Sequence, residues 1–253
     1  MLVVKNLSVH FRQHHGAPLS PIRDVSFSLK RGGVTGLVGG SGAGKSLIAE
    51  ALIGNLPRNA EITGHMAFDG APPKPGTLAL APQGRDSLDP LCPVGRQVAR
   101  FAKLAGRPCD VPALFERLGL SPESLEHSPH ALSGGMAKRV LLATALATGA
   151  DCIIADEPTA GLDGEAADRI MALLASLATG GKAILVISHD LMRLTQIADQ
   201  MVILEEGQQV DVTSAEAFHE GRLAHPFTKA LWQAQTWNGF AMAAAEGGEN
   251  AES

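Results

Sequence analysis

The chain has 253 residues, of which 45% are hydrophobic, 19% are charged and 4% are aromatic, and its formal net charge is −5. This composition is typical of a globular protein with one large or two small domains, and it excludes disorder or coiled coil over most of the length. The mild negative charge and the lack of Tyr disfavour a nucleic-acid coat or a base-stacking platform, so no nucleic-acid partner is expected. No apolar run reaches the roughly 20 residues of a membrane helix, and the first residues do not resemble a signal peptide.

The three cysteines, Cys92, Cys109 and Cys152, form no CxxC pair and are odd in number. A disulfide framework or a zinc site is therefore not expected, and a reduced cytoplasmic compartment fits. The adjacent His14 and His15 are expected to lie in a solvated loop, because two histidines without further ligands cannot complete the coordination of a metal ion. Any role at a membrane must then come through a partner.

The N-terminal third is predicted to consist mainly of strands, joined by turns at Gly32-Gly33 and Asp69-Gly70. Alternating or short apolar runs place these strands at 2–11, 25–29, 34–38, 65–68 and 78–81. A glycine-rich segment follows the third of these strands and leads into a helix over 47–52.

Prolines punctuate the sequence between 84 and 131, where helices are predicted at 94–105 and 113–118. Beyond them, helices and strands alternate at 136–147, 152–155, 165–177, 183–187, 191–198 and 201–204. This alternation predicts a parallel sheet covered on both faces. We interpret the chain as an α/β core of residues 1–83 and 149–222, an inserted helical subdomain of residues 84–148, and a C-terminal extension of residues 223–253. A frayed tail is expected from Ala241 onward.

The segment between the third strand and the first helix fits the phosphate-loop pattern G-x-x-x-x-G-K-[ST]. It consists of Gly39, Gly40, Ser41, Gly42, Ala43, Gly44, Lys45 and Ser46, with Leu47 continuing the helix. Its glycines allow successive N–H groups to point at phosphate oxygens, and the helix N-terminus adds partial positive charge. Lys45 is expected to reach the β- and γ-phosphates, and Ser46 is expected to ligate Mg²⁺. The position between a strand and a helix favours this interpretation over a chance match.

The short apolar strand at 152–155 ends in two acids, Asp156 and Glu157. Acids at the carboxyl end of a strand lie where α/β folds bind their ligands. Taken alone, such a pair is more often a solvated strand end, but the phosphate loop upstream favours a function. Asp156 is then expected to hold Mg²⁺ through water, and Glu157 to orient or deprotonate the attacking water.

The sequence Leu132-Ser133-Gly134-Gly135-Met136 precedes an amphipathic helix, and Ser133 is a typical N-cap residue. The segment is either a capped helix alone or a second helix N-terminus offered to phosphate. A second, distant phosphate site within one chain makes sense if two chains sandwich each nucleotide between them.

These segments and the later Ser188-His189-Asp190 occur in the order found in ATP-binding subunits of ABC transporters, a family that the chain resembles over residues 1–235. The resemblance implies a P-loop ATPase fold with a parallel-sheet core, an N-terminal antiparallel β subdomain and an inserted helical subdomain. It also implies ATP and Mg²⁺ as ligands and a second ATPase subunit as partner. Two integral-membrane permease subunits and, indirectly, an extracellular or periplasmic binding protein complete the expected assembly, at the cytoplasmic face of the membrane.

The same resemblance implies roles for further residues. Gln83 would contact Mg²⁺ and sense the membrane subunit, and His189 would be the switch histidine at the γ-phosphate. Ser133 and Gly135 would bind the ATP of the partner chain. The segment Gly161-Leu162-Asp163 would cross the dimer interface, which brings Asp163 to the nucleotide.

The chain departs from the family pattern at two places. The signature segment ends in Met136 where Gln is usual, and a thioether accepts hydrogen bonds only weakly. The segment that follows Gln83 lacks the proline often found there, so the surface that couples to the membrane subunit is expected to differ locally. With no Tyr available, Phe11 is the candidate for stacking on adenine, and core packing at the end of a strand is an equal alternative.

A C-terminal motif, His225-Pro226-Phe227-Thr228-Lys229-Ala230-Leu231, is similar to that of peptide and nickel importers, and the other motifs most resemble the nickel-importer ATPase. No Cys follows Cys152, so the iron–sulfur cysteine cluster of many peptide-importer relatives is absent. The favoured function is ATP hydrolysis that powers uptake of nickel, another metal chelate, or di- or oligopeptides. Two alternatives stay open: an accessory ATPase of a soluble complex, such as one for phosphonate degradation, and a nucleotide-gated clamp with negligible turnover.

Overall fold

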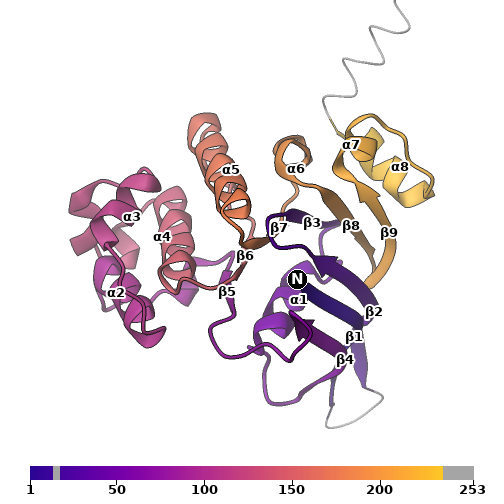
Figure 1. The fold of residues 1–253 in the computed structure, drawn as a ribbon, viewed down its shortest axis with the longest axis horizontal. Coiled ribbons are helices and arrows are strands. Elements are labelled where there is room, and N and C mark those ends of the chain that lie inside the picture. The colour runs from indigo at the N-terminus through magenta and orange to yellow at the C-terminus, as the bar shows by residue number, and fades with distance from the viewer. Residues whose placement is uncertain (14–17, 236–253) are drawn as a thin grey trace, which may run out of the picture.

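The computed structural model describes residues 1–13 and 18–235, so His14, His15 and the tail from Ala241 lie outside the described residues. The strands are β1 (Leu2–Phe11), β2 (Leu19–Leu29), β3 (Val34–Gly39), β4 (Ala60–Phe68), β5 (Leu78–Ala81), β6 (Cys152–Asp156), β7 (Ala183–Ile187), β8 (Gln200–Glu205) and β9 (Gln208–Ser214). Across the described residues they form one sheet in the order β4-β1-β2-β9-β8-β3-β7-β6-β5 (Figure 1).

The sheet combines a parallel centre with antiparallel strands. Strands β5, β6, β7, β3 and β8 pair in parallel, in that order. Strand β1 pairs antiparallel with both β2 and β4 near the N-terminus, and β9 folds back antiparallel on β8. The predicted α/β fold class, with a parallel core and an antiparallel β region, is confirmed. The β8–β9 hairpin, which adds a further antiparallel pair, was not predicted.

The helices are α1 (Lys45–Ile53), α2 (Val94–Leu104), α3 (Val111–Arg117), α4 (Gly134–Ala147), α5 (Gly164–Thr179), α6 (Leu191–Ile197), α7 (Ala215–His219) and α8 (Pro226–Gln233), with 3₁₀ turns at Arg85–Ser87, Pro122–Glu126 and Pro129–Ala131. Helices α2, α3 and α4 gather beyond the β5 edge of the sheet, at the left of Figure 1. The boundaries of the three proposed subdomains stay a prediction. None of the helices in the described residues is long and apolar enough to cross a membrane.

Two hydrophobic clusters occupy opposite faces of the central sheet. Along β6, Ile153 belongs to one cluster and Ile154 to the other, because successive side chains of a strand point to opposite faces. The first cluster includes buried side chains of α4 and α5, and the second includes Ile48 and Leu52 of α1. The sheet is therefore covered on both sides, and α1 is fixed by its buried face directly after the phosphate loop.

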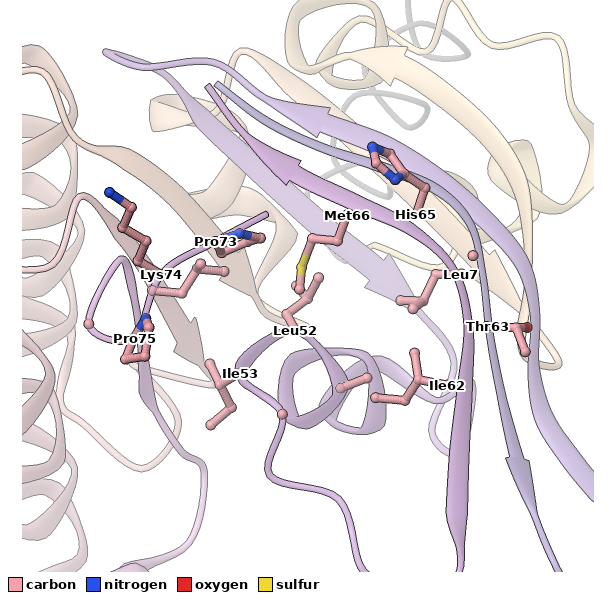
Figure 2. A pocket seen from close by; sticks show the side chains of 15 residues that line it. Leu7, Leu52, Ile53, Ile62, Thr63, His65, Met66, Pro73, Lys74 and Pro75 are labelled. Carbon is pink, nitrogen blue, oxygen red and sulfur yellow. The ribbon is translucent and has the colours of Figure 1, made fainter. Parts of the chain in front are cut away.

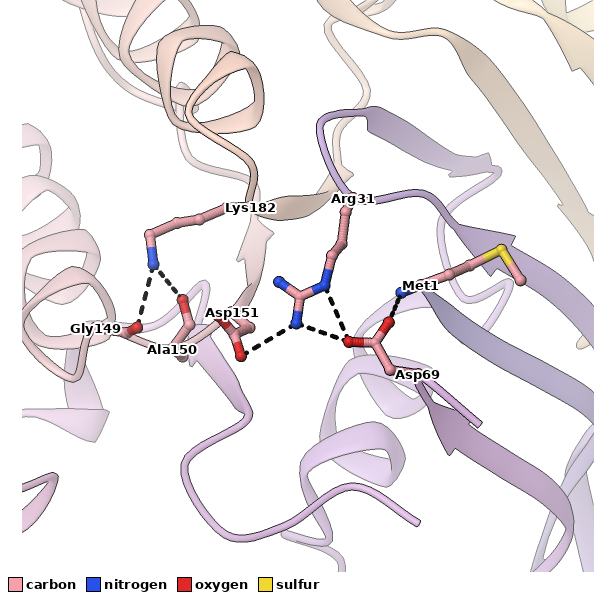
Figure 3. Close-up of polar contacts among 7 residues, drawn as sticks. All are labelled: Met1, Arg31, Asp69, Gly149, Ala150, Asp151 and Lys182. Carbon is pink, nitrogen blue, oxygen red and sulfur yellow. Dashed lines mark hydrogen bonds and ion pairs between the residues drawn. The ribbon is translucent and has the colours of Figure 1, made fainter. Parts of the chain in front are cut away.

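A polar network joins the antiparallel strands to the central sheet (Figure 3). The guanidinium of Arg31 lies 2.8 Å from a carboxylate oxygen of Asp69 and 3.3 Å from one of Asp151, and it stacks 4.7 Å above the ring of Phe68. The amine of Met1 also pairs with Asp69. Hydrogen bonds from Arg31 are the main reason why the pKa of Asp69 falls to about 2. Because these groups are substantially exposed, their ion pairs contribute little to the free energy of unfolding.

The C-terminal motif anchors α8 to the sheet. Thr228 is fully buried, and its hydroxyl donates a 2.7 Å hydrogen bond to Asp211 in β9. Phe227, Leu231 and Trp232 pack against the first hydrophobic cluster. The resemblance motif at 225–231 thus has a structural role, since it fixes a helix on the β8–β9 hairpin.

We expect Thr228→Val to lower the free energy of unfolding by about 1–3 kcal/mol, because it leaves the Asp211 carboxylate without its donor in a partly buried place. Urea unfolding of the full chain measures this change. The exposed Thr63 of β4 provides a control, and Thr63→Val should change the stability by less than about 0.5 kcal/mol. Equal effects of the two substitutions would contradict an anchoring role.

Candidate functional site

A pocket of about 430 Å³ opens at the carboxyl ends of β3, β6 and β7. We call it the phosphate pocket, because residues of the predicted phosphate loop line it. It is lined by Gly39, Ser41, Gly42, Gly44, Lys45, Ser46, Leu47, Gln83, Asp156, Glu157 and His189. The carboxyl edge of a parallel sheet is where open α/β folds bind their ligands. The structure therefore brings together the phosphate loop, the two acids, Gln83 and His189, which the sequence spreads over 151 positions from 39 to 189.

Glycine is required at both ends of the phosphate loop. A Cβ atom on Gly39 would lie 2.3 Å from the carbonyl oxygen of Leu204 in β8, and one on Gly44 would lie 2.2 Å from Ile22. Gly44 is also the N-cap of α1 and has a φ of 92°, which favours glycine. The loop is consequently held close to the sheet, with the first turn of α1 facing the pocket.

The middle of the loop is open to a ligand. Nothing lies within 4 Å of a Cβ placed on Gly40 or Gly42, whereas Ala43 is buried and its N–H donates to the Gly40 carbonyl. Lys45 folds back, and its ammonium donates to the carbonyls of Gly39 and Gly40 at 2.9 Å each. Burial lowers the pKa of Lys45, while the charges of Glu157 and Asp156 oppose that change. The ammonium is thus poised at the loop, where a phosphate would replace its carbonyl partners.

The two acids at the end of β6 are almost buried, with 6% of Asp156 and 7% of Glu157 exposed. Burial raises the pKa of Asp156, and a hydrogen bond with Ser46 opposes this. The Oδ1 atom of Asp156 is buried without a hydrogen-bond partner. The Asp156 carboxylate, the Ser46 hydroxyl and the Gln83 amide all line this pocket and all supply oxygen atoms. Mg²⁺ prefers oxygen ligands, so these three residues fit that ion.

Glu157 has a strained backbone. Its φ is 52°, a left-handed conformation that costs a residue other than glycine about 1–3 kcal/mol. Its N–H donates to the Ile187 carbonyl at 2.8 Å, and its own carbonyl accepts from Ala160 N at 3.3 Å and from the Lys138 ammonium at 2.9 Å. These contacts hold the strained residue in place and aim its carboxylate into the pocket.

His189 faces Glu157 across the pocket. Its Nδ1 lies 2.7 Å from Glu157 Oε2, and 72% of its side chain is exposed. The two groups are close but not aligned as a hydrogen bond, and Oε2 is buried without a hydrogen-bond partner. The Glu157 carboxylate is thus covered on this side by the His189 ring.

The residues that are expected to meet the nucleotide of the partner chain lie outside this pocket. Ser133 is exposed, and its hydroxyl caps α4 by accepting from Met136 N at 3.2 Å. Gly135 packs against Leu162, and Asp163 caps α5 by accepting from Ala166 N at 2.8 Å. These residues do not contribute to the lining of the phosphate pocket in their own chain.

Two other predictions concern Phe11 and Met136. Phe11 ends β1, is half-buried and packs against the second hydrophobic cluster, and it does not line the pocket. Met136 is also half-buried and packs against the first cluster. Each side chain thus packs partly against the core. Adenine stacking by Phe11 stays a prediction.

A second cavity, of about 450 Å³, differs in character (Figure 2). It lies between the C-terminal end of α1, strand β4 and the loop before β5, and aliphatic side chains such as Leu52, Ile62 and Met66 line it. Its lining contains no carboxylate and shares no residue with the phosphate pocket. The groups that can act on a nucleotide are therefore concentrated at the carboxyl edge of the sheet.

The fold and the pocket together define a P-loop nucleotide-binding ATPase. Residues 22–160 match the family described as ABC transporter, and this chain belongs to that family. The predicted class of enzyme, an ABC-type ATPase that binds ATP, is confirmed.

Similarity to individual relatives extends over about nine-tenths of the chain. The oligopeptide transport ATP-binding protein OppD of Lactococcus lactis subsp. cremoris is 32% identical, over 91% of this chain and 74% of the relative. The "Probable peptide ABC transporter ATP-binding protein y4tR" of Sinorhizobium fredii is 31% identical, over 91% of this chain and 75% of its own length.

Solved structures have the same fold. The dimeric ATP-binding cassette MJ0796, in a post-hydrolysis state bound to ADP and Pi, superposes with a TM-score of 0.75 at 22% identity, over 85% of this chain and 99% of its own. An ATP binding subunit of an ABC transporter gives a TM-score of 0.71 at 25% identity, over 87% and 92% of the two chains. These likenesses establish the ATPase cassette architecture.

Proposed function

We propose that this chain hydrolyses ATP to power an importer of peptides through separate membrane subunits. The observation that carries the proposal is the likeness, over about nine-tenths of the chain, to proteins named for oligopeptide and peptide transport. The anchored motif at 225–231 is in accord with this branch. The motifs that resemble the nickel-importer ATPase gain no support from these relatives, so uptake of nickel or another metal chelate becomes the second candidate.

The chemistry follows from the pocket. Loop N–H groups, Lys45 and the start of α1 would bind the phosphates, and Ser46, Gln83 and Asp156 would hold Mg²⁺, which supplies charge neutralisation when bound. Glu157 would orient the attacking water and accept its proton. His189, beside Glu157, would contact the γ-phosphate.

The proposed partner is a second ATPase chain. Ser133, Gly135 and Asp163 lie at the starts of α4 and α5, outside the phosphate pocket of their own chain. Two chains arranged head to tail would place these residues on the nucleotide of the other chain. Because importers in the peptide and nickel branch usually pair two different ATPases, we propose a sister subunit rather than a stable homodimer.

A membrane subunit would contact the helical region. Leu91 and Leu104 are 91% and 78% exposed, which is unusual for leucine, and Phe101 is also exposed. Phe101 lines a cavity of about 450 Å³ between α1, β5, α2 and α4, and Pro82, next to Gln83, also contributes to its wall. These features favour a permease contact that reaches the phosphate pocket through Gln83, at the cytoplasmic face of the membrane.

We expect Ser133→Arg to leave ATP binding by the isolated chain intact. In the assembled complex it should block hydrolysis at the site whose lysine belongs to the partner, because a bulky cation replaces a small hydroxyl that must meet phosphate. Hydrolysis is measured in complexes in which only one of the two sites is competent. Ser133→Ala is the control, since it removes the cap, at a cost of roughly 0.5–2 kcal/mol, without adding a cation. Equal turnover by the Arg variant and the wild type would contradict the shared site.

Co-purification and transport-coupled turnover test the proposed function. Isolated from its native membranes, the chain should bring two integral-membrane subunits with it. In proteoliposomes, a peptide-loaded binding protein should stimulate ATP hydrolysis, and a nickel-loaded one should not. Recovery with soluble lyase subunits would instead support the accessory ATPase of a phosphonate-degrading complex, and absence of turnover in every complex would support the nucleotide-gated clamp.

A further inference from the structure

Lys138, in the second turn of α4, contacts the backbone of Glu157, a residue that lines the phosphate pocket. Its ammonium donates a 2.9 Å hydrogen bond to the backbone carbonyl of Glu157. The side chain is half-buried and is not part of the pocket lining, so it reaches Glu157 from the α4 side and not from the nucleotide side. Its hydrogen bond with Glu157 is therefore to the backbone and not to the carboxylate.

The same face of α4 touches the segment that follows Glu157. Gly135 lies three residues before Lys138, a spacing that puts the two on one side of a helix. A Cβ on Gly135 would lie 2.7 Å from Leu162 Cδ2 and 3.5 Å from the carbonyl of Gly161. Helix α4, which Ser133 caps, is thus in contact with both ends of the segment 157–162.

The backbone of Glu157 depends on a few contacts. Its carbonyl accepts a longer bond of 3.3 Å from Ala160 N besides the bond from Lys138. Because φ at this residue is 52°, a strained conformation that persists only when its surroundings hold it, we expect loss of a contact at the carbonyl to let the peptide rotate and the carboxylate move. Burial lowers the pKa of Lys138 and the charges of Glu157 and Asp156 oppose this, so the ammonium is withdrawn from water and faces the acids.

We propose that Lys138 is a positioning residue for hydrolysis, which ties the helix beginning at Ser133 to the backbone of Glu157 through the hydrogen bond at the Glu157 carbonyl. A nucleotide that engages Ser133 from the partner chain would then bias the carboxylate that orients water in this chain. The inference rests on the proposed role of Glu157.

The test compares side chains with and without a donor in the full chain with its partner ATPase. Lys138→Met removes the donor, and we expect kcat for ATP hydrolysis to fall by about 10- to 10²-fold with KM changed less than about twofold, because displacement of a catalytic group by around 1 Å has effects of that size. Lys138→Arg and Lys138→Gln keep a donor and should retain kcat within about threefold of the wild type. Lys138→Ala replaces the Met variant should that variant not fold.

Lys182 provides a matched control. It is also half-buried and also donates to backbone carbonyls, those of Gly149 and Ala150 (Figure 3). Unlike Glu157, these two acceptor residues do not line the phosphate pocket. Lys182→Met should lower the melting temperature and leave kcat near that of the wild type. Unchanged kcat in Lys138→Met, or a Gln variant as impaired as the Met variant, overturns the inference.

Glu157→Gln, measured alongside, separates the two levels of the proposal. If it loses turnover while Lys138→Met keeps it, the role of Lys138 is wrong and that of Glu157 stands. If Glu157→Gln itself keeps turnover, the role assigned to Glu157 is wrong.

Discussion

Replacement of Glu157 by Gln is expected to lower ATP turnover by about 10²-fold or more, while ATP binding stays nearly unchanged. The amide keeps the size of the side chain but cannot take a proton from water. Glu157 is 7% exposed, lies beside His189 and lines the phosphate pocket, so we expect its carboxylate to orient a water that enters with the nucleotide. Steady-state hydrolysis and isothermal titration of ATP measure the two quantities.

Glu206 is the control for this prediction. It also has a left-handed backbone, with a φ of 46°, but it is exposed in the β8–β9 turn and does not line the phosphate pocket. Glu206→Gln should leave turnover unchanged. A normal rate in Glu157→Gln would show that another group accepts the proton.

Lys45→Ala is expected to weaken ATP binding by roughly 10- to 10²-fold, since charge-assisted hydrogen bonds contribute about 1.5–3 kcal/mol each. In the structure the ammonium is held at the loop by the carbonyls of Gly39 and Gly40, ready to exchange them for phosphate oxygens. Calorimetric titration of ATP measures the loss. The exposed Lys229 on α8 is the control, and Lys229→Ala should bind ATP as the wild type does. Unchanged affinity in Lys45→Ala would mean that the loop does not cradle the phosphates.

Local patterns predicted the central sheet well. Strands β5 and β7 match their predicted bounds, and β3 extends one residue further than predicted, because each is a short apolar run bounded by turn residues. The segment at β9 was missed because Gln208–Ser214 is only partly buried and has no apolar run. Helix α8 was described as a family motif only, since eight residues after a proline give little periodicity.

The pocket was predictable where chemistry is tied to a sequence pattern, as in the phosphate loop and the two acids. Contacts between distant segments were not. The bond from Lys138 to Glu157 joins residues 19 positions apart through a backbone carbonyl, and no residue pattern indicates such an acceptor. The φ of Glu157 likewise follows from its contacts with β7 and α4, which only the fold supplies.

We propose above all that each nucleotide is hydrolysed between two ATPase chains. The most direct test is ATP turnover per chain, measured as a function of the concentration of this chain and of its partner ATPase. We predict that turnover per chain rises with concentration and saturates as pairs form, because Ser133 and Lys45 of one chain serve different nucleotides. Efficient turnover by a strictly monomeric chain, at a rate per chain that does not depend on concentration, would contradict the account.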